Sequence, residues 1–108
     1  MRIIRIHLVA LVIILLLFTA GSVSAQKVHI TKYKSEADKV IYVTQYKSEA
    51  DLVVYETEYA SEALLYSGIW YFTKYKSEAD WVIYFTKYSS ESDIKVYFTK
   101  YKSEAGWN

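Results

Sequence analysis

The chain has 108 residues, of which 53% are hydrophobic and 18% aromatic, with a formal net charge of +1 and no cysteine. This length favours a single domain, and the missing cysteine excludes a disulfide framework. After residue 25 the chain carries eleven lysines and twelve acidic residues, a formal charge of −1, which argues against a nucleic-acid binder.

The N-terminal segment has the three-part layout of a secretory signal peptide. Arg2 and Arg5 give it a positive start, and residues 8–18 form an apolar run of eleven residues. Small residues follow, and Val23 and Ala25 occupy the −3 and −1 positions of a cleavage site. The apolar run is shorter than the about 20 residues that span a membrane.

We therefore predict a signal peptide over residues 1–25 and a single repeat-built domain over residues 26–108. The protein is expected to be secreted or periplasmic. The absence of cysteine excludes a lipid anchor on a thiol, so no stable membrane anchor is expected once the signal is cleaved.

An internal repeat dominates the rest of the chain. Each unit is a short apolar run followed by a segment close to Tyr-x-Ser-Glu-Ala-Asp. The units are 13 residues apart, with one interval of 16, and their tyrosines are Tyr33, Tyr46, Tyr59, Tyr75, Tyr88 and Tyr101. The three extra residues fall in the stretch 64–68, where Ser67-Gly68 predicts a turn.

The apolar run of each unit predicts a β-strand, because it combines β-branched and aromatic residues over about six positions. Alternation divides each strand into two faces. One face repeats Tyr, Thr and Tyr, and we expect these tyrosines to pack as a ladder with threonine bonds across strands. The other face is the predicted core, with Glu56 as its one polar member: Val28, Ile30, Ile41, Val43, Val54, Trp70, Phe72, Ile83, Phe85, Val96 and Phe98. It ends in Lys32, Gln45, Glu58, Lys74, Lys87 and Lys100.

The second part of each unit predicts a single helical turn. Ser35-Glu36-Ala37-Asp38 has the Ser-x-x-Asp form, in which the serine caps the turn and the acid reaches back. Leu64 and Gly106 break this pattern at the ends of the third and last units. The sequence thus predicts a mainly β fold of six to seven short strands joined by Ser-capped helical turns, in a compact or barrel-like stack.

The repeated unit resembles the septoil-knot domain family, a group of small bacterial domains. The resemblance rests on Lys-Tyr-Lys-Ser-Glu-Ala-Asp, on the ending over residues 100–107 and on near-copies of the unit at Tyr46, Tyr75 and Tyr88. It implies a chain deeply wound through itself into a seven-crossing torus knot, which no composition or spacing predicts. It implies no catalytic residue, cofactor or substrate.

The candidate site residues have structural explanations as well as functional ones. His29 is a possible catalytic base, but it takes the place of a repeat tyrosine. The acidic pairs could bind Ca²⁺ or act as acid and base, but each Glu-Ala-Asp supplies at most two ligands, so no metal site is predicted. The pairs are Glu36/Asp38, Glu49/Asp51, Glu78/Asp80 and Glu91/Asp93.

The tryptophans are the best candidates for contact with a ligand, because aromatic rings on exported β domains can stack on sugars. They are Trp70, Trp81 and Trp107. We expect a non-enzymatic exported structural domain of unknown partner, without a cofactor and monomeric. The alternative is a glycan- or peptide-binding module that uses exposed Tyr and Trp; a hydrolase is the weakest reading, because the sequence shows no nucleophile and base together.

Overall fold

The computed structural model describes residues 26–64 and 68–108; the predicted signal peptide lies outside them. In this part of the chain, seven strands alternate with six short 3₁₀ helices. The strands are β1 (Lys27–Ile30), β2 (Lys39–Val43), β3 (Leu52–Glu56), β4 (Ile69–Phe72), β5 (Trp81–Phe85), β6 (Ile94–Phe98) and β7 (Gly106–Trp107). The helices are η1 (Lys34–Glu36), η2 (Lys47–Glu49), η3 (Ala60–Leu64), η4 (Lys76–Glu78), η5 (Ser89–Glu91) and η6 (Lys102–Glu104). The predicted mainly β fold is confirmed.

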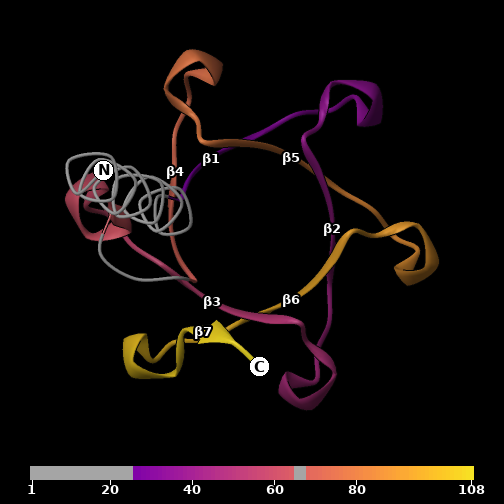
Figure 1. The fold of residues 1–108 in the computed structure, drawn as a ribbon, viewed down its shortest axis with the longest axis vertical. Helices are drawn as coiled ribbons and strands as arrows, with labels where there is room; N and C mark the ends of the chain where they lie inside the picture. The colour runs from indigo at the N-terminus through magenta and orange to yellow at the C-terminus, as the bar shows by residue number, and fades with distance from the viewer. Residues whose placement is uncertain (1–25, 65–67) are drawn as a thin grey trace, which may run out of the picture.

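Six of the strands form a closed parallel barrel. Their order around the ring is β1, β5, β2, β6, β3 and β4, and β4 pairs again with β1. The chain therefore runs around the ring twice: a first circuit places β1 to β3, and a second circuit places β4 to β6 between them. Figure 1 shows the ring, with the short helices projecting outward from it.

The long interval between repeat units offsets the two circuits. Each 13-residue step passes over one strand position, from β1 to β2 and from β2 to β3. The step that contains the three extra residues advances by a single position, so that β4 lies beside β3, with Tyr55 opposite Ile69. The second circuit consequently falls between the strands of the first.

The chain ends where a further strand has no place. One more full step from β6 would reach the position that β4 occupies. The chain instead forms β7, which pairs antiparallel with β3, Gly106 opposite Val53. Gly106 has φ 138°, in the region that favours glycine. Gly68, with φ 84°, approaches so closely that a Cβ there would lie 2.5 Å from the nitrogen of Gly106.

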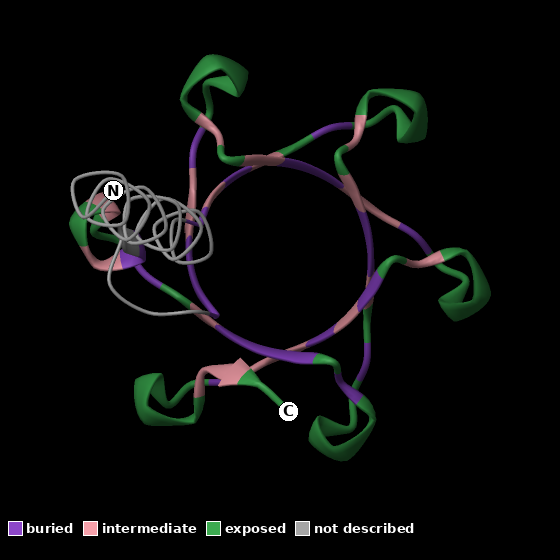
Figure 2. Ribbon diagram, in the orientation of Figure 1, coloured by how far each residue is buried: buried purple, intermediate pink, exposed green. Residues whose placement is uncertain are grey.

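The core fills the inside of the ring in layers, as the strand alternation requires. The middle layer takes one residue from each barrel strand, and all of them have 0% exposure: Val28, Ile41, Val54, Trp70, Ile83 and Val96. Trp70 makes edge contacts with Phe72, Trp81 and Phe98 at centroid distances of 6.2, 6.3 and 6.2 Å. Figure 2 shows burial concentrated on the ring and exposure on the turns.

Two predicted core residues are wrong. Ile30 and Val43 are 49% and 43% exposed, because they lie one layer beyond the middle of the barrel, at the carboxyl ends of β1 and β2. Conversely, Val40, Val53 and Val82 are buried although they share the parity of the tyrosine face.

The predicted serine caps are also wrong. In η1, η2, η4, η5 and η6 the N-cap residue, directly before the helix, is a tyrosine. Its side chain makes no cap bond. The serines lie inside the short helices instead. The buried threonine two residues before each tyrosine instead accepts the backbone N–H of that tyrosine, as described below.

Every described pairing of strands, and the cluster of buried residues inside the ring, lies within residues 26–108. The pairings that close the barrel therefore join described strands to one another.

Candidate functional site

A threonine holds each outer turn in the same way. The hydroxyl of Thr31 accepts the backbone N–H of Tyr33 at 3.1 Å and donates to the carboxylate of Glu36 at 3.0 Å. The backbone N–H of Thr31 donates to the carbonyl of Ile83 on the neighbouring strand β5 at 2.8 Å. The same three bonds recur at Thr44, Thr57, Thr73, Thr86 and Thr99. The predicted threonine bonds across strands come from the backbone, and the side chains bond locally.

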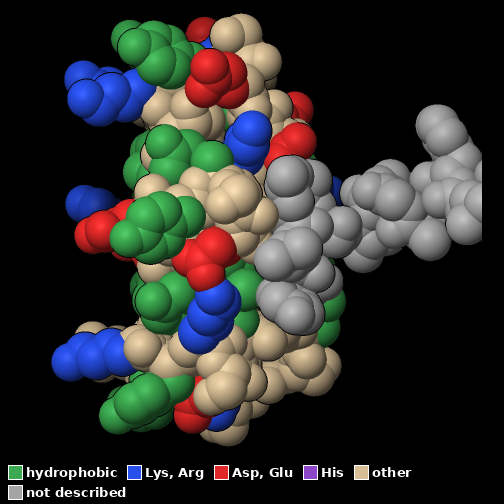
Figure 3. Space-filling view, turned by 90° about the vertical axis from the view of Figure 1, so that its left-hand side faces the viewer, with side chains coloured by type: hydrophobic (Ala, Val, Ile, Leu, Met, Phe, Trp, Pro, Cys, Tyr) green, Lys and Arg blue, Asp and Glu red, His purple; other side chains and the backbone are tan. Residues whose placement is uncertain are grey.

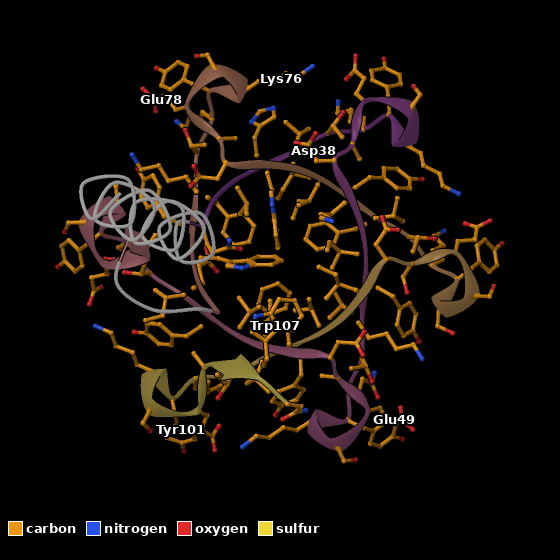
Figure 4. The ribbon with its side chains drawn as sticks, viewed as in Figure 1. Asp38, Glu49, Lys76, Glu78, Tyr101 and Trp107 are labelled. Carbon is orange, nitrogen blue, oxygen red and sulfur yellow. The ribbon has the colours of Figure 1, made fainter. Side chains whose placement is uncertain are left out.

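The aspartates of the acidic pairs join strands that are far apart in sequence. The carboxylate of Asp38 accepts the N–H of Val82 at 2.8 Å, while the N–H of Asp38 donates to the carbonyl of Val82 at 2.7 Å. Equivalent two-point contacts join Asp51 to Lys95, Asp80 to Lys27 and Asp93 to Val40. Figure 4 labels Asp38 at the base of its turn.

The two acids of each pair therefore have different partners and do not converge on one point. Glutamate bonds the threonine of its own unit, and aspartate bonds a distant strand. In residues 26–64 and 68–108, no three His, Asp or Glu side chains gather as metal ligands would. His29 is used for structure as well, since its Nδ1 donates to the carbonyl of Thr73 at 3.0 Å.

Ion pairs join neighbouring turns around the outside of the ring. Lys34 lies 3.5 Å from Glu91, and Lys47 lies 3.1 Å from Glu104. Lys102 pairs with Glu62. The hydrogen bond from Lys102, with a second from Thr57, lowers the pKa of Glu62 below its ordinary value. Bonds from Thr99 and then Lys47 lower the pKa of Glu104 likewise.

Two units lack the lysine at the start of the short helix: Ala60 stands there in η3 and Ser89 in η5. At the interface between η5 and η2, Ser89 therefore has no ammonium to pair with Glu49. Beside it is a hollow of about 440 Å³, lined by Tyr42, Thr44, Glu49, Ser89 and Lys95. Figure 4 labels Glu49 on the outer side of the ring. The lining offers an aromatic ring, a carboxylate, hydroxyls and an ammonium to a small polar ligand.

The three candidate tryptophans do not share one surface. Trp70 has 0% exposure at the centre of the barrel, so it is wrong as a ligand-contacting residue. Trp81 is half-buried, with the Lys39 ammonium 5.7 Å from its ring centroid. Trp107 is 53% exposed and in Figure 4 turns from β7 toward the inside of the ring.

The repeat tyrosines divide into two sets. Tyr42, Tyr55, Tyr71, Tyr84 and Tyr97 are half-buried. The other six, which precede the short helices, are 63–66% exposed, so the packed ladder expected for them is wrong: Tyr33, Tyr46, Tyr59, Tyr75, Tyr88 and Tyr101. Sequence alternation could not separate the two sets, because both have the same parity.

The winding of the chain agrees with comparison to known proteins. The model of one family, described as the 7(1) septoil knot domain, matches residues 25–108. The chain belongs to this family. No curated protein and no solved structure matches the chain. The septoil knot assignment fits the two interleaved circuits of this barrel.

Within the described part of the septoil knot domain, no helix is long and apolar enough to span a membrane. Its strands alternate with 3₁₀ turns of three to five residues. The glutamates of these turns bond threonines, and the aspartates that follow η1, η2, η4 and η5 bond distant strands.

Proposed function

We propose that this septoil knot domain is exported, non-enzymatic and structural, a self-locked scaffold that keeps its fold outside the cytoplasm. The supporting observation is the use of its polar side chains. The glutamates hold threonines, the aspartates hold distant strands, and His29 holds a main-chain carbonyl. The carboxylates of the acidic pairs and the imidazole of His29 are thus engaged in structural contacts.

The ring also protects its own backbone. The six described barrel strands pair on both sides, so among the described strands only the two-residue β7 presents an edge. Both ends of the domain are held: β1 lies between β4 and β5, and Asn108 donates to the carbonyls of Lys47 and Ala50 at 2.9 and 2.8 Å. Because the circuits interleave, opening one strand disturbs neighbours from the other circuit, which favours slow unfolding.

The test is resistance to a broad-specificity protease, with the protein beginning at Gln26. We expect cleavage to follow global unfolding, so that its rate matches the unfolding rate measured in denaturant. Asp93→Ala removes one contact between strands and should accelerate both rates; Lys100→Ala, on an exposed side chain, is the matched control. Rapid cleavage of the unaltered domain under native conditions would contradict the proposal.

A second candidate function, a glycan-binding module, is favoured by the hollow between η5 and η2. Its size suits a small ligand, and its mixed polar and aromatic lining suits a sugar. Tyr42 supplies the ring, and Glu49 and Lys95 supply hydrogen bonds to hydroxyls. This site differs from the tryptophans that the sequence suggested.

Titration with mono- and disaccharides, followed by NMR shifts of the lining residues, tests this candidate. Ser89→Lys would fill the hollow and should abolish binding. Ser77→Lys, on an exposed position of η4, adds the same charge elsewhere and should leave binding unchanged. Shifts that survive Ser89→Lys, or no shifts with any sugar, would remove the candidate.

A further inference from the structure

The carboxyl ends of the barrel strands form a mouth that exposes apolar side chains. The inward-facing residue at the end of each strand is apolar in five cases and acidic in one: Ile30, Val43, Glu56, Phe72, Phe85 and Phe98. The phenylalanines are half-buried and pack against the core. Ile30 and Val43 are about half exposed, although the layer above them is fully buried.

The exposed part of this mouth is continuous. β1, β5 and β2 are neighbours in the ring, so Ile30, Phe85 and Val43 form one apolar arc. Isolated exposed apolar residues need no explanation, but a contiguous apolar surface marks a place where a monomer meets something else. The backbone next to the arc is already paired, since Thr31 and Thr86 donate to the neighbouring strands. A peptide therefore has no strand edge to extend here.

A cationic rim surrounds the arc. Two residues beyond each inward-facing residue stands an exposed side chain, and four of these are lysines against one acid: Lys32, Gln45, Glu58, Lys74, Lys87 and Lys100. The exposed tyrosines follow directly. Figure 3 shows Lys and hydrophobic side chains projecting along the left-hand edge of the ring, with acidic atoms among them. Apolar centres with lysines and amphipathic aromatic rings around them are typical of surfaces that rest on anionic lipid.

We propose that the carboxyl-end mouth is a reversible docking surface for an anionic lipid bilayer. Ile30, Val43 and Phe85 enter the headgroup region, and Lys32 and Lys87 lie against lipid phosphates. The rim charge is spread around a ring without a directional set of hydrogen bonds, which fits a fluid charged surface better than a folded partner. This binding is peripheral and differs from a membrane anchor.

Co-sedimentation with vesicles tests the proposal, using residues 26–108, which lie within the septoil knot family match, so that the apolar N-terminal segment does not contribute. Vesicles of phosphatidylcholine alone are compared with vesicles that also contain phosphatidylglycerol. We expect binding only to the anionic vesicles, weakening as salt is added. Lys32→Gln with Lys87→Gln should reduce the partition coefficient about tenfold or more. Ile30→Ser with Val43→Ser should reduce it by a similar factor.

The matched control changes two lysines at the amino ends of β1 and β2, at the opposite side of the barrel from the mouth: Lys27→Gln with Lys39→Gln should alter binding less than about twofold. An equal loss in this control would overturn the proposal, because it would show a general charge effect. So would binding that is indifferent to salt and to the apolar substitutions, or no binding to anionic vesicles at all. Binding of a soluble polysaccharide that the rim substitutions abolish would reassign the surface to a glycan. The salt series on the unaltered protein decides the case even if a variant fails to fold.

Discussion

The two circuits of the chain share one motif but fill the barrel differently. In the middle layer the first circuit supplies Val28, Ile41 and Val54, which are all aliphatic. Within the described barrel, the aromatic side chains of the core come from the second circuit: Trp70, Phe72, Trp81, Phe85 and Phe98. Because strands of the two circuits alternate around the ring, each large residue stands between smaller neighbours. Identical units could not fill so narrow a barrel without overpacking it.

The outer turns show the opposite behaviour. The bonds among threonine, tyrosine and glutamate are the same in both circuits, with Tyr N–H to Thr distances of 3.1–3.2 Å throughout. Local geometry is thus copied from unit to unit, while the interior requires complementary sizes. The two circuits should therefore respond differently to substitutions in the core and alike to substitutions in the turns.

The largest effect is expected at the centre of the second circuit. Trp70→Ala should lower the free energy of unfolding by about 3–5 kcal/mol, because it leaves a cavity that the closed ring cannot collapse to fill. Urea titration measures the loss. Trp107→Ala, on an exposed ring, is the control and should cost far less. A small loss of unfolding free energy for Trp70→Ala would show that the aromatic side chains of the second circuit do not dominate the stability of the core.

Exchanging sizes between the circuits sharpens the comparison. Val54 and Trp70 lie in the same layer on the neighbouring strands β3 and β4. Val54→Trp alone should destabilise the fold by about 1–3 kcal/mol through overpacking. Adding Trp70→Val to it keeps the volume, and we expect the double variant to be more stable than the sum of the single losses predicts. Simple additivity in denaturant titrations would contradict the complementary filling of the layer.

Matched threonine substitutions test whether the turns are equivalent. Thr44→Val in the first circuit and Thr86→Val in the second each remove a hydroxyl that bonds a tyrosine N–H and a glutamate. Each should cost about 1–2 kcal/mol, as the loss of a helix cap does. Unfolding free energies that differ widely between the two variants would break the equivalence.

Acid should weaken turns of both circuits, since Glu62 closes the first circuit and Glu104 the second. Their pKa values are lowered in the fold. A carboxyl with a lowered pKa contributes stability above its unfolded pKa, and that contribution is lost as the pH falls through the folded value. The melting temperature should therefore decrease as the pH drops below the ordinary titration range of glutamate. Glu62→Gln with Glu104→Gln should flatten this pH dependence. An unchanged slope would show that these ion pairs are not linked to folding.

The smallest effect is expected at the interface between η5 and η2, where Ser89 replaces the lysine found in four of the six units. Ser89→Lys should place an ammonium near Glu49, as Lys34 lies near Glu91. Because such pairs are exposed, the gain is expected to be below about 1 kcal/mol. A melting curve at low and high salt measures it, and a gain that persists in high salt would have another cause.

Much of the local structure could be predicted from the repeat. Alternation identified the strands and the whole middle layer, since every unit has the same register. It failed at Ile30 and Val43, because the height of a residue within a barrel depends on strand pairing. The role of the aspartates could not be predicted either, since Asp38 bonds Val82, 44 residues away.

For the candidate site, the sequence pointed to tryptophans and the structure to other places. Trp70 was misassigned because a ring that fills a core and a ring that contacts a ligand look alike in a strand pattern. The hollow beside Ser89 lies at an interface between units that are distant in sequence. The repeat offers only a weak signal for it, since the lysine is lost at Ala60 as well as at Ser89.

The three extra residues between β3 and β4 also limit how many strands the ring can hold. Open solenoids grow by adding repeats at their ends. Here the offset second circuit occupies the remaining positions of the ring. The two-residue strand β7 lies outside the ring and pairs with β3. A further unit inserted after β6 would find its position in the ring occupied by β4 and would have to lie outside the barrel.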